Sequence, residues 1–264
     1  MTKIYTKQSL IEELKKIAAM GWIPNARPGN DGAVGNTLED LLGIEENNLP
    51  MPNAAEWELK TQRLGTLALT TLLHMEPSPR AIKFVPMILL PQYGWQHTEA
   101  GNKYPEGEMS FRQTIHALSR SNRGFVVKID RTTSRVLISF DASAVASHHE
   151  EWLGGVKDKS GLGELEPQPY WGFDDLQHRA GTKLPNSIYV QAEVKKEDGT
   201  EFYKYSKVIM LKKFKWEGFL QTLERAQMLV DFDARTGHNH GTKFRMHKNS
   251  LPTLYEESAT IIGH

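Results

Sequence analysis

The segment from Trp57 to Thr61 limits the possible folds of this chain more than any other feature. Its residues, Trp-Glu-Leu-Lys-Thr, alternate in character, which predicts a β-strand. Side chains two residues apart on a strand point to the same face. Glu58 and Lys60 should therefore lie side by side, while Trp57 and Leu59 pack on the opposite face. The chain is expected to hold a charged pair on a strand whose other face is in the core.

Helix and strand patterns mix along the rest of the 264 residues. Helices are predicted over 8–20 with Ser9 as its cap, from Thr37 to about Gly43, and over 108–118 and 215–227. Strands are predicted over 67–75, 82–90, 125–130, 135–141, 187–194 and 201–207, the last four as two hairpins. Residues 24–36 and 154–185 are predicted to be irregular. Because βαβ regularity is lacking, the fold class is α+β, or an irregular α/β fold.

The composition excludes several kinds of chemistry. The chain has no cysteine, which rules out disulfides, thiolate catalysis, zinc–thiolate sites and iron–sulfur clusters. No signal peptide or long apolar stretch is visible, so we expect a cytoplasmic protein that has no membrane partner.

The formal net charge of zero hides two unlike regions. Residues 1–60 hold 6 Lys and Arg against 9 Asp and Glu, whereas residues 203–248 hold 10 against 4. This places carboxylates around the predicted charged pair, where a cation could bind. It places basic groups near the C-terminus, where a polyanion could bind.

A carboxylate beside an ammonium group is suited to phosphodiester hydrolysis. The carboxylate can hold a divalent cation, and the lysine can orient the attacking water or stabilise charge on the phosphate. A further acidic residue from a preceding turn would complete the metal site, and hard oxygen ligands favour Mg²⁺. The alternative is an ordinary surface Glu–Lys pair on a half-buried strand.

Residues 35–66 resemble the active-site region of the MvaI/BcnI group of type II restriction endonucleases, in the MutH-like branch of the PD-(D/E)xK nucleases. In that group a helix glutamate precedes a Pro-Asp turn, and the turn precedes Glu-Leu-Lys. By position, Glu39 resembles the helix glutamate, Glu58 the strand carboxylate and Lys60 the catalytic lysine. The resemblance implies that Glu58 and position 53 bind Mg²⁺, and that Glu39 is an outer-sphere metal ligand or orients Lys60.

Position 53 departs from this pattern, because Asn53 stands where the group has aspartate. An amide is a neutral and weaker ligand than a carboxylate. The chain is then either an inactivated Asp-to-Asn variant or a natural sequence with weakened or redirected activity. We favour the inactivated variant, because the surrounding residues fit the motif.

A second segment, residues 232–245, places polar side chains densely between glycines. Arginine can bind the O6 and N7 of guanine, and aspartate can accept from the cytosine amino group. The segment resembles the DNA-recognition region of the same group, which implies that Asp233 and Arg235 read a G:C pair. Further base or phosphate contacts are expected from His238, His240, Lys243 and Arg245. The alternative is a solvated polar loop.

The resemblance implies a PD-(D/E)xK restriction-endonuclease-like fold: a mixed central sheet flanked by helices, with two lobes around a cleft. We expect one unit over 1–264, with a catalytic lobe over 1–125 and a DNA-recognition lobe over 126–264. The enzyme would be a monomer that cuts double-stranded DNA one strand at a time at a short C/G-rich site. A cognate DNA methyltransferase is expected in the same cell.

Other functions stay open. The chain could be a mismatch-repair nicking endonuclease of the MutH kind, a catalytically silent sequence-specific DNA-binding protein, or an unrelated α+β protein. A metal role for His238-Asn239-His240 is disfavoured because no second ligand cluster has suitable spacing. The run from His148 to Glu151 could be a ligand cluster but is more typical of a solvated helix start. Arg120, Arg123 and Arg131 are either phosphate contacts or ordinary surface charges.

Overall fold

The computed structural model describes residues 5–30, 32–44, 57–65 and 69–263. The chain forms two compact units, and each unit consists of separate stretches of sequence. Unit 1 contains Met1–Thr70, His178–Gly218 and His247–His264, and unit 2 contains Thr71–Gln177 and Phe219–Met246. The expected lobe boundary at 125/126 falls inside unit 2, so the lobes predicted as continuous stretches do not coincide with these units.

Unit 1 is built on a five-stranded sheet with the order β1-β10-β9-β2, in which β14 also pairs with β10. Strand β2 runs parallel to β9, and the other pairings are antiparallel, so the sheet is mixed as expected. The predicted strand at residue 57 and the hairpin between β9 and β10 are confirmed. The strands are β1 (Ile23–Pro24), β2 (Trp57–Arg63), β9 (Asn186–Glu197), β10 (Thr200–Phe214) and β14 (Tyr255–Ile262), which follows the 3-10 helix η4 (Lys248–Leu254).

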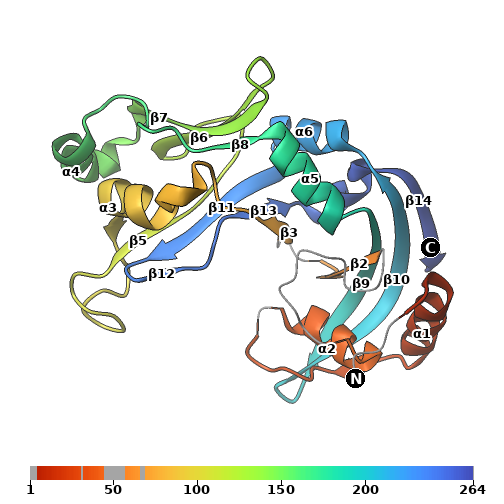
Figure 1. Cartoon of the computed structure of the whole chain (residues 1–264). Coiled ribbons are helices and arrows are strands. Elements are labelled where there is room, and N and C mark those ends of the chain that lie inside the picture. Colours follow the sequence, from red (N-terminus) through yellow and green to blue (C-terminus); the bar gives the residue numbers. More distant parts are fainter. Residues whose placement is uncertain (1–4, 31, 45–56, 66–68, 264) are drawn as a thin grey trace. The chain divides into compact units, whose positions relative to one another are not determined.

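Helices α1 (Lys7–Ala19) and α2 (Ala33–Leu42) cover one face of this sheet (Figure 1). Their buried side chains, among them Leu14 and Leu38, share a core with Leu59 of β2 and with Ile188 and Val190 of β9. This core confirms that Leu59 points inward. It also leaves the opposite face of β2 to Glu58 and Lys60.

Two helix starts differ from the sequence prediction. The N-cap of α1 is Thr6 rather than Ser9, because the Thr6 hydroxyl accepts from the Ser9 amide while the Ser9 hydroxyl accepts from the Thr6 amide. Helix α2 begins at Ala33, four residues before the predicted start at Thr37, which is buried inside the helix. Its predicted end is confirmed, since Gly43 adopts a left-handed conformation with φ of 66°.

Unit 2 contains a six-stranded sheet with the order β3-β13-β11-β5-β4, in which β12 pairs with β11, and a three-stranded sheet with the order β6-β7-β8. The strands are β3 (Thr70–His74), β4 (Trp95–Gln96), β5 (Met109–Ile115), β6 (Arg123–Asp130), β7 (Arg135–Val145), β8 (Tyr170–Gly172), β11 (Met228–Arg235), β12 (His238–Asn239) and β13 (Lys243–Met246). The predicted β6–β7 hairpin is confirmed.

Short helical segments connect these strands. They are η1 (Arg80–Ile82), the π-helical η2 (Val85–Leu89), α3 (Leu90–Tyr93), η3 (Ser147–His149) and α4 (Glu150–Ser160). Helices α5 (Phe173–Lys183) and α6 (Trp216–Glu224) lie at the points where the chain passes between the units. Aromatic rings fill the core of unit 2: the Phe125 centroid lies 5.5 Å from that of Phe111 and 5.1 Å from that of Phe140.

Three further sequence predictions are wrong. Residues 82–90 form helical turns rather than a strand, residues 108–118 contain strand β5 rather than a helix, and residues 154–185 contain most of α4 and all of β8 and α5. The prediction at 67–75 holds in part, since β3 covers Thr70–His74, and the helix predicted at 215–227 is confirmed as α6. In the described residues, no helix is both long and apolar enough to cross a membrane.

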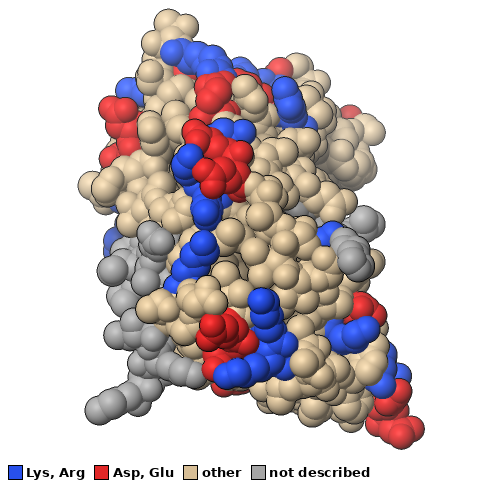
Figure 2. Space-filling model, turned by 90° about the vertical axis from the view of Figure 1, so that its right-hand side faces the viewer, with Lys and Arg blue, Asp and Glu red and all other residues tan. Residues whose placement is uncertain are grey.

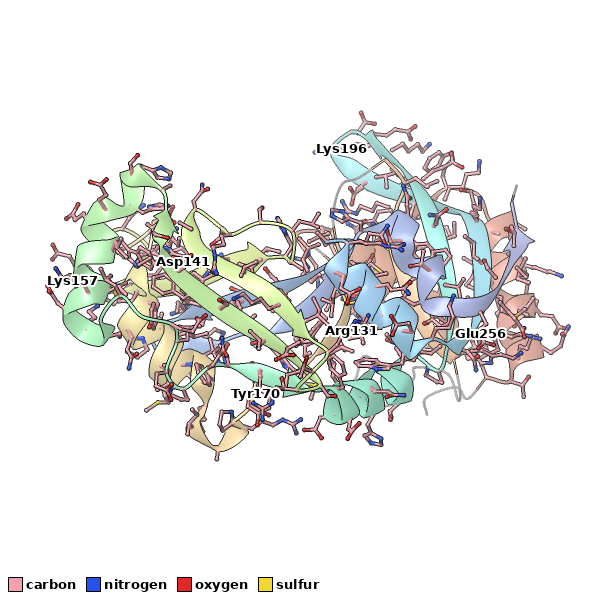
Figure 3. The ribbon with its side chains drawn as sticks, turned by 90° about the horizontal axis from the view of Figure 1, so that it is seen from above. Arg131, Asp141, Lys157, Tyr170, Lys196 and Glu256 are labelled. Atoms are coloured by element: carbon pink, nitrogen blue, oxygen red, sulfur yellow. The ribbon has the colours of Figure 1, made fainter. Side chains whose placement is uncertain are left out.

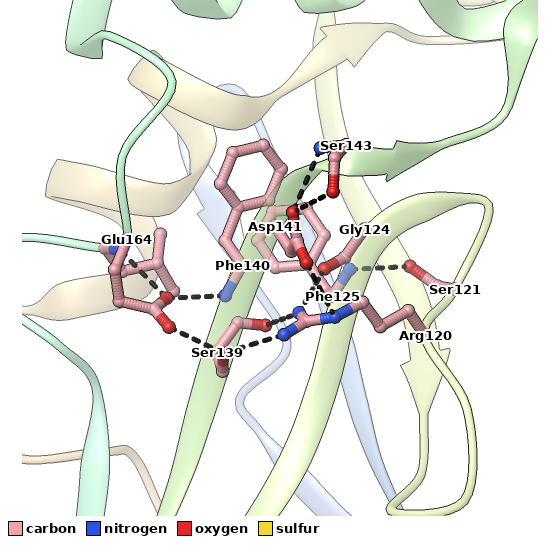
Figure 4. Close-up of polar contacts among 10 residues, drawn as sticks. Arg120, Ser121, Gly124, Phe125, Ser139, Phe140, Asp141, Ser143 and Glu164 are labelled. Carbon is pink, nitrogen blue, oxygen red and sulfur yellow. Dashed lines mark hydrogen bonds and ion pairs between the residues drawn. The ribbon is translucent and has the colours of Figure 1, made fainter.

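The arginines around the β6–β7 hairpin mostly bind the protein itself. Arg120 donates to the carbonyl oxygen of Gly124 at 2.8 Å, and lies beside Ser139 and Asp141 (Figure 4). Arg131 pairs with Glu224 at 2.9 Å. Arg123 stacks 3.9 Å from the ring of Trp95, and burial lowers the pKa of its guanidinium. These contacts give each arginine a structural role in unit 2.

Candidate functional site

Glu58 and Lys60 lie on β2 and touch each other. Lys60 Nζ donates to Glu58 Oε1 at 2.8 Å, as the two-residue spacing predicts. Strand β2 pairs in parallel with β9, which places Glu58 opposite Ser187 and Lys60 opposite Tyr189. The neighbouring strand thus fixes the backbone that carries both charged groups.

The carboxylate of Glu58 is almost completely buried, with 2% of its side chain exposed. A second ammonium group contacts it: Lys183 Nζ, at the end of α5, lies 3.1 Å from Glu58 Oε2. The Lys183 contact is an ion pair without hydrogen-bond alignment, because Oε2 is buried and accepts no hydrogen bond from the described residues. The buried carboxylate therefore accepts a hydrogen bond on Oε1, and among the described residues Oε2 has only the ion pair with Lys183.

Uncharged hydrogen-bonding groups surround this pair. The Ser187 and Tyr255 hydroxyls bond to each other, and the Tyr189 hydroxyl donates to Gln62 Oε1, which also accepts from Thr70 at 3.1 Å. Burial raises the pKa of Tyr255, the Ser187 bond opposes this, and the charge of Glu58 adds to it. Burial likewise raises the pKa of Tyr189, so both tyrosines stay protonated at neutral pH.

Glu39 lies half-buried on α2. The apolar residues of that helix pack with Leu59, and a Cβ at Gly35 would lie 3.9 Å from the Cβ of Thr61. Leu59 and Thr61 are on the face of β2 opposite to Glu58 and Lys60. The structure therefore places Glu39 on the neighbouring helix, and its catalytic role stays a prediction. Asn53 lies outside the described residues.

The described part of the chain offers one partial site for a hard cation. It contains no cluster of three or more His, Cys, Asp or Glu side chains that could hold a metal. Glu58 Oε2, however, is a buried oxygen without a hydrogen bond, which fits a first ligand for Mg²⁺. A second side-chain ligand would have to come from elsewhere, and position 53 is the one that the sequence suggests.

Of the predicted DNA-contact residues, all but His240 lie on strands of unit 2 rather than in one loop. Asp233 and Arg235 belong to β11, and Lys243 and Arg245 belong to β13, its antiparallel partner. The intervening Phe232, Ala234 and Phe244 are buried. The polar side chains alternate with these residues and share the other face.

Each of these charged residues has a partner within the protein. Asp233 accepts from Arg112 at 2.8 Å and from Lys243 at 3.0 Å. Arg245 pairs with Asp231 at 3.3 Å. Arg235 pairs with Glu108 at 2.9 Å, and its guanidinium lies 4.7 Å from the centre of the Tyr104 ring. On this face, the basic side chains of β13 therefore pair with the acidic side chains of β11, and Arg235 pairs with Glu108.

His238 and His240 are exposed at the tip, with ring centroids 4.2 Å apart. The segment that follows is held by Glu76, whose Oε1 accepts from the Thr242 amide at 2.8 Å. Sequence reasoning missed Glu76, Glu108, Arg112 and Lys183. All four are distant in sequence from their partners, and no local spacing marks them.

Comparison with known proteins gives one family. A family model described as the MvaI/BcnI restriction endonuclease family matches residues 11–255. A solved complex of restriction endonuclease MvaI with a cognate DNA substrate has a TM-score of 0.77 and 23% sequence identity, covering 98% of this chain and 100% of that chain. MvaI in the absence of DNA has a TM-score of 0.55 and 24% identity, covering 99% and 100%. No curated protein matches this chain. The structural similarity confirms the expected mixed α+β fold.

Proposed function

This chain belongs to the MvaI/BcnI restriction endonuclease family, and we propose that it hydrolyses phosphodiester bonds of double-stranded DNA at a specific sequence. The observation that carries the proposal is the buried Glu58 on β2, in contact with Lys60. Both residues lie within the matched range 11–255. In an ordinary surface Glu–Lys pair, the carboxylate would be exposed to solvent. The carboxylate of Glu58 is instead nearly inaccessible and contacts two lysines.

In the proposed mechanism, Glu58 and residue 53 would hold Mg²⁺. The bound ion would supply water activation and charge neutralisation at the phosphate. Lys60 orients the water for attack in line with the leaving oxygen, and the products carry 5′-phosphate and 3′-hydroxyl ends. Glu39 would act as an outer-sphere ligand or orient Lys60.

Asn53 stands at a position where the proposed mechanism requires a metal ligand, so it bears on whether this chain is active. A neutral amide leaves Glu58 as the only anionic ligand in the proposed pair. We propose that Asn53 inactivates the enzyme, and that Asn53→Asp restores cleavage of mixed plasmid and phage DNA in the presence of Mg²⁺. No gain of cleavage would contradict this proposal. Specific DNA binding without cleavage, even in Asn53→Asp, would instead favour a catalytically silent DNA-binding protein.

The catalytic assignment is tested in the Asn53→Asp background. Lys60→Ala and Glu58→Ala should each abolish cutting and leave DNA binding largely intact, because they remove water positioning and metal binding. Lys195→Ala is the matched control: Lys195 lies on β9 and pairs with Glu197 at 2.8 Å. Cleavage retained by Lys60→Ala would refute the assignment. Cleavage that depends on hemimethylated sites and protein partners would favour a MutH-like nicking enzyme.

We propose that β11 and β13 read the DNA through Arg235 and its neighbours, at a short, nearly palindromic C/G-rich site. Arg235→Lys should keep the charge near Glu108 but lose bidentate guanine binding. Specific binding should weaken by about 1–3 kcal/mol, with nonspecific binding nearly unchanged. Titration of specific and unrelated duplexes at one salt concentration measures both affinities. An equal loss for both duplexes would assign Arg235 to phosphate contact. A DNA methyltransferase of the same specificity is the expected cellular partner.

A further inference from the structure

We propose that Lys183 is a positioning residue that occupies the metal-binding oxygen of Glu58, and that it makes divalent-cation binding weak until DNA arrives. The inference rests on the proposed function, because it concerns the same carboxylate. Lys183 lies outside the sequence motif, and its contact with Glu58 gives a reason for metal binding to depend on substrate.

The two oxygens of Glu58 are held differently. Oε1 accepts an aligned hydrogen bond from Lys60 at 2.8 Å, whereas Oε2 has only the ion pair with Lys183 at 3.1 Å. An unaligned contact is the weaker of the two. A cation that binds Glu58 should therefore replace Lys183 on Oε2 and leave Lys60 in place to orient the water.

The charges of these three groups oppose metal binding. Glu58 supplies one negative charge, and Lys60 and Lys183 supply two positive charges within contact distance. Because the carboxylate is only 2% exposed, water screens these charges poorly. A divalent ion at Oε2 would lie next to two ammonium groups, and each would repel it.

Lys183 is placed so that it can leave. It is the last residue of α5, its side chain is 18% exposed, and its ammonium group stands on a flexible four-carbon stem. A DNA phosphate offers this ammonium group an alternative anionic partner. Substrate binding would then draw Lys183 from Oε2 and open this oxygen to the cation.

The test is the affinity of the DNA-free protein for Mn²⁺, measured by electron paramagnetic resonance. Lys183→Met removes the competing charge while keeping an unbranched side chain, and should tighten Mn²⁺ binding by about tenfold or more. Lys183→Arg keeps the charge and should bind Mn²⁺ as weakly as the unmodified protein. Lys183→Gln serves as a second neutral variant if Lys183→Met does not fold by circular dichroism.

Two controls localise the effect. Lys195→Met removes a positive charge from β9, eight residues along the strand from the partner of Glu58, and should leave Mn²⁺ affinity unchanged. Glu58→Gln, combined with Lys183→Met, should abolish the tightened binding. Equal Mn²⁺ affinity in the unmodified protein and both neutral variants would overturn the inference, as would the absence of measurable binding in all of them.

DNA cleavage separates this inference from the proposed function. In the Asn53→Asp background, Lys183→Met should still cleave DNA and should reach its half-maximal rate at a lower Mn²⁺ concentration, because the competing charge is gone. Cleavage that is normal, with Mn²⁺ affinity independent of Lys183, would overturn only the role of Lys183. Tight Mn²⁺ binding without cleavage in any background would overturn the proposed function instead.

Discussion

The carboxylate of Asp233 holds two basic side chains in place. Its two oxygens accept from Arg112 and Lys243, and its side chain is 17% exposed. Burial acts to raise the pKa of Asp233, but the hydrogen bonds from Lys243 and Arg112 outweigh it, so the pKa lies below its ordinary value of 3.8. The ionised form is therefore favoured in the folded protein.

This lowered pKa gives a pH-dependent prediction. A carboxyl group whose pKa falls on folding stabilises the protein above its unfolded pKa, and the contribution is lost as the pH drops through the lower folded value. Asp233→Asn should destabilise the protein by about 1 kcal/mol at pH 7, since solvent screens the exposed Arg112. Urea unfolding at pH 7 and pH 3 should show the difference shrinking at pH 3. If the loss of stability in Asp233→Asn were the same at pH 7 and pH 3, the prediction would be contradicted. Asp158→Asn on α4 is the control.

The spacing of residues along the chain predicts side-chain contacts within β2. It predicts no contact between segments that are distant in sequence. The period of two residues placed Glu58 beside Lys60. It could not identify Lys183, because α5 and β2 meet only in the folded protein. The alternation of 231, 233 and 235 likewise gave no sign that Glu108 and Arg112 of the β5 region would pair with Arg235 and Asp233.

At the element scale, α2 supports the strand that carries Glu58. Leu38 is fully buried against the core around Leu59, whereas Leu41 on the same helix is 38% exposed. Leu38→Ala should lower the free energy of unfolding by about 2–5 kcal/mol, because it leaves a cavity. Leu41→Ala should change it by about 0.5 kcal/mol or less. Chemical denaturation measures both, and equal losses would show that α2 does not pack as described.

The errors among the predicted elements have specific physical causes. Residues 111 and 115 are buried and four apart, and this spacing puts side chains on one face of either a helix or a strand. The pattern in segment 108–118 therefore fits either a helix or a strand. The segment contains a strand because β5 pairs with β11. The strand predicted at 82–90 contains Pro86, and proline fits the first turn of a helix, where it stands in η2.

At the scale of the whole molecule, charge counted along the sequence does not describe the surface. The basic stretch 203–248 includes Lys204 and Lys212 of β10, and these pair with Glu193 and Glu257 from other strands. Figure 2 shows blue and red groups intermingled on one face of the molecule. Exposed charges such as Lys157, Lys196 and Glu256 likewise project from separate elements (Figure 3). Part of the positive charge of this stretch is therefore balanced by carboxylates from other strands.

Each chain carries one Glu58–Lys60 pair, and this predicts that the two DNA strands are cut one after the other. The two strands of DNA are antiparallel, so one site can address one phosphodiester bond at a time. If the active protein is a monomer, a supercoiled plasmid with one cleavage site should accumulate as open circles before linear DNA appears, at a rate proportional to enzyme concentration. Gel analysis of Asn53→Asp digests, with sedimentation of the same sample, measures both properties. Direct conversion to linear DNA by a sedimenting dimer would contradict sequential cutting, since two sites would then act together.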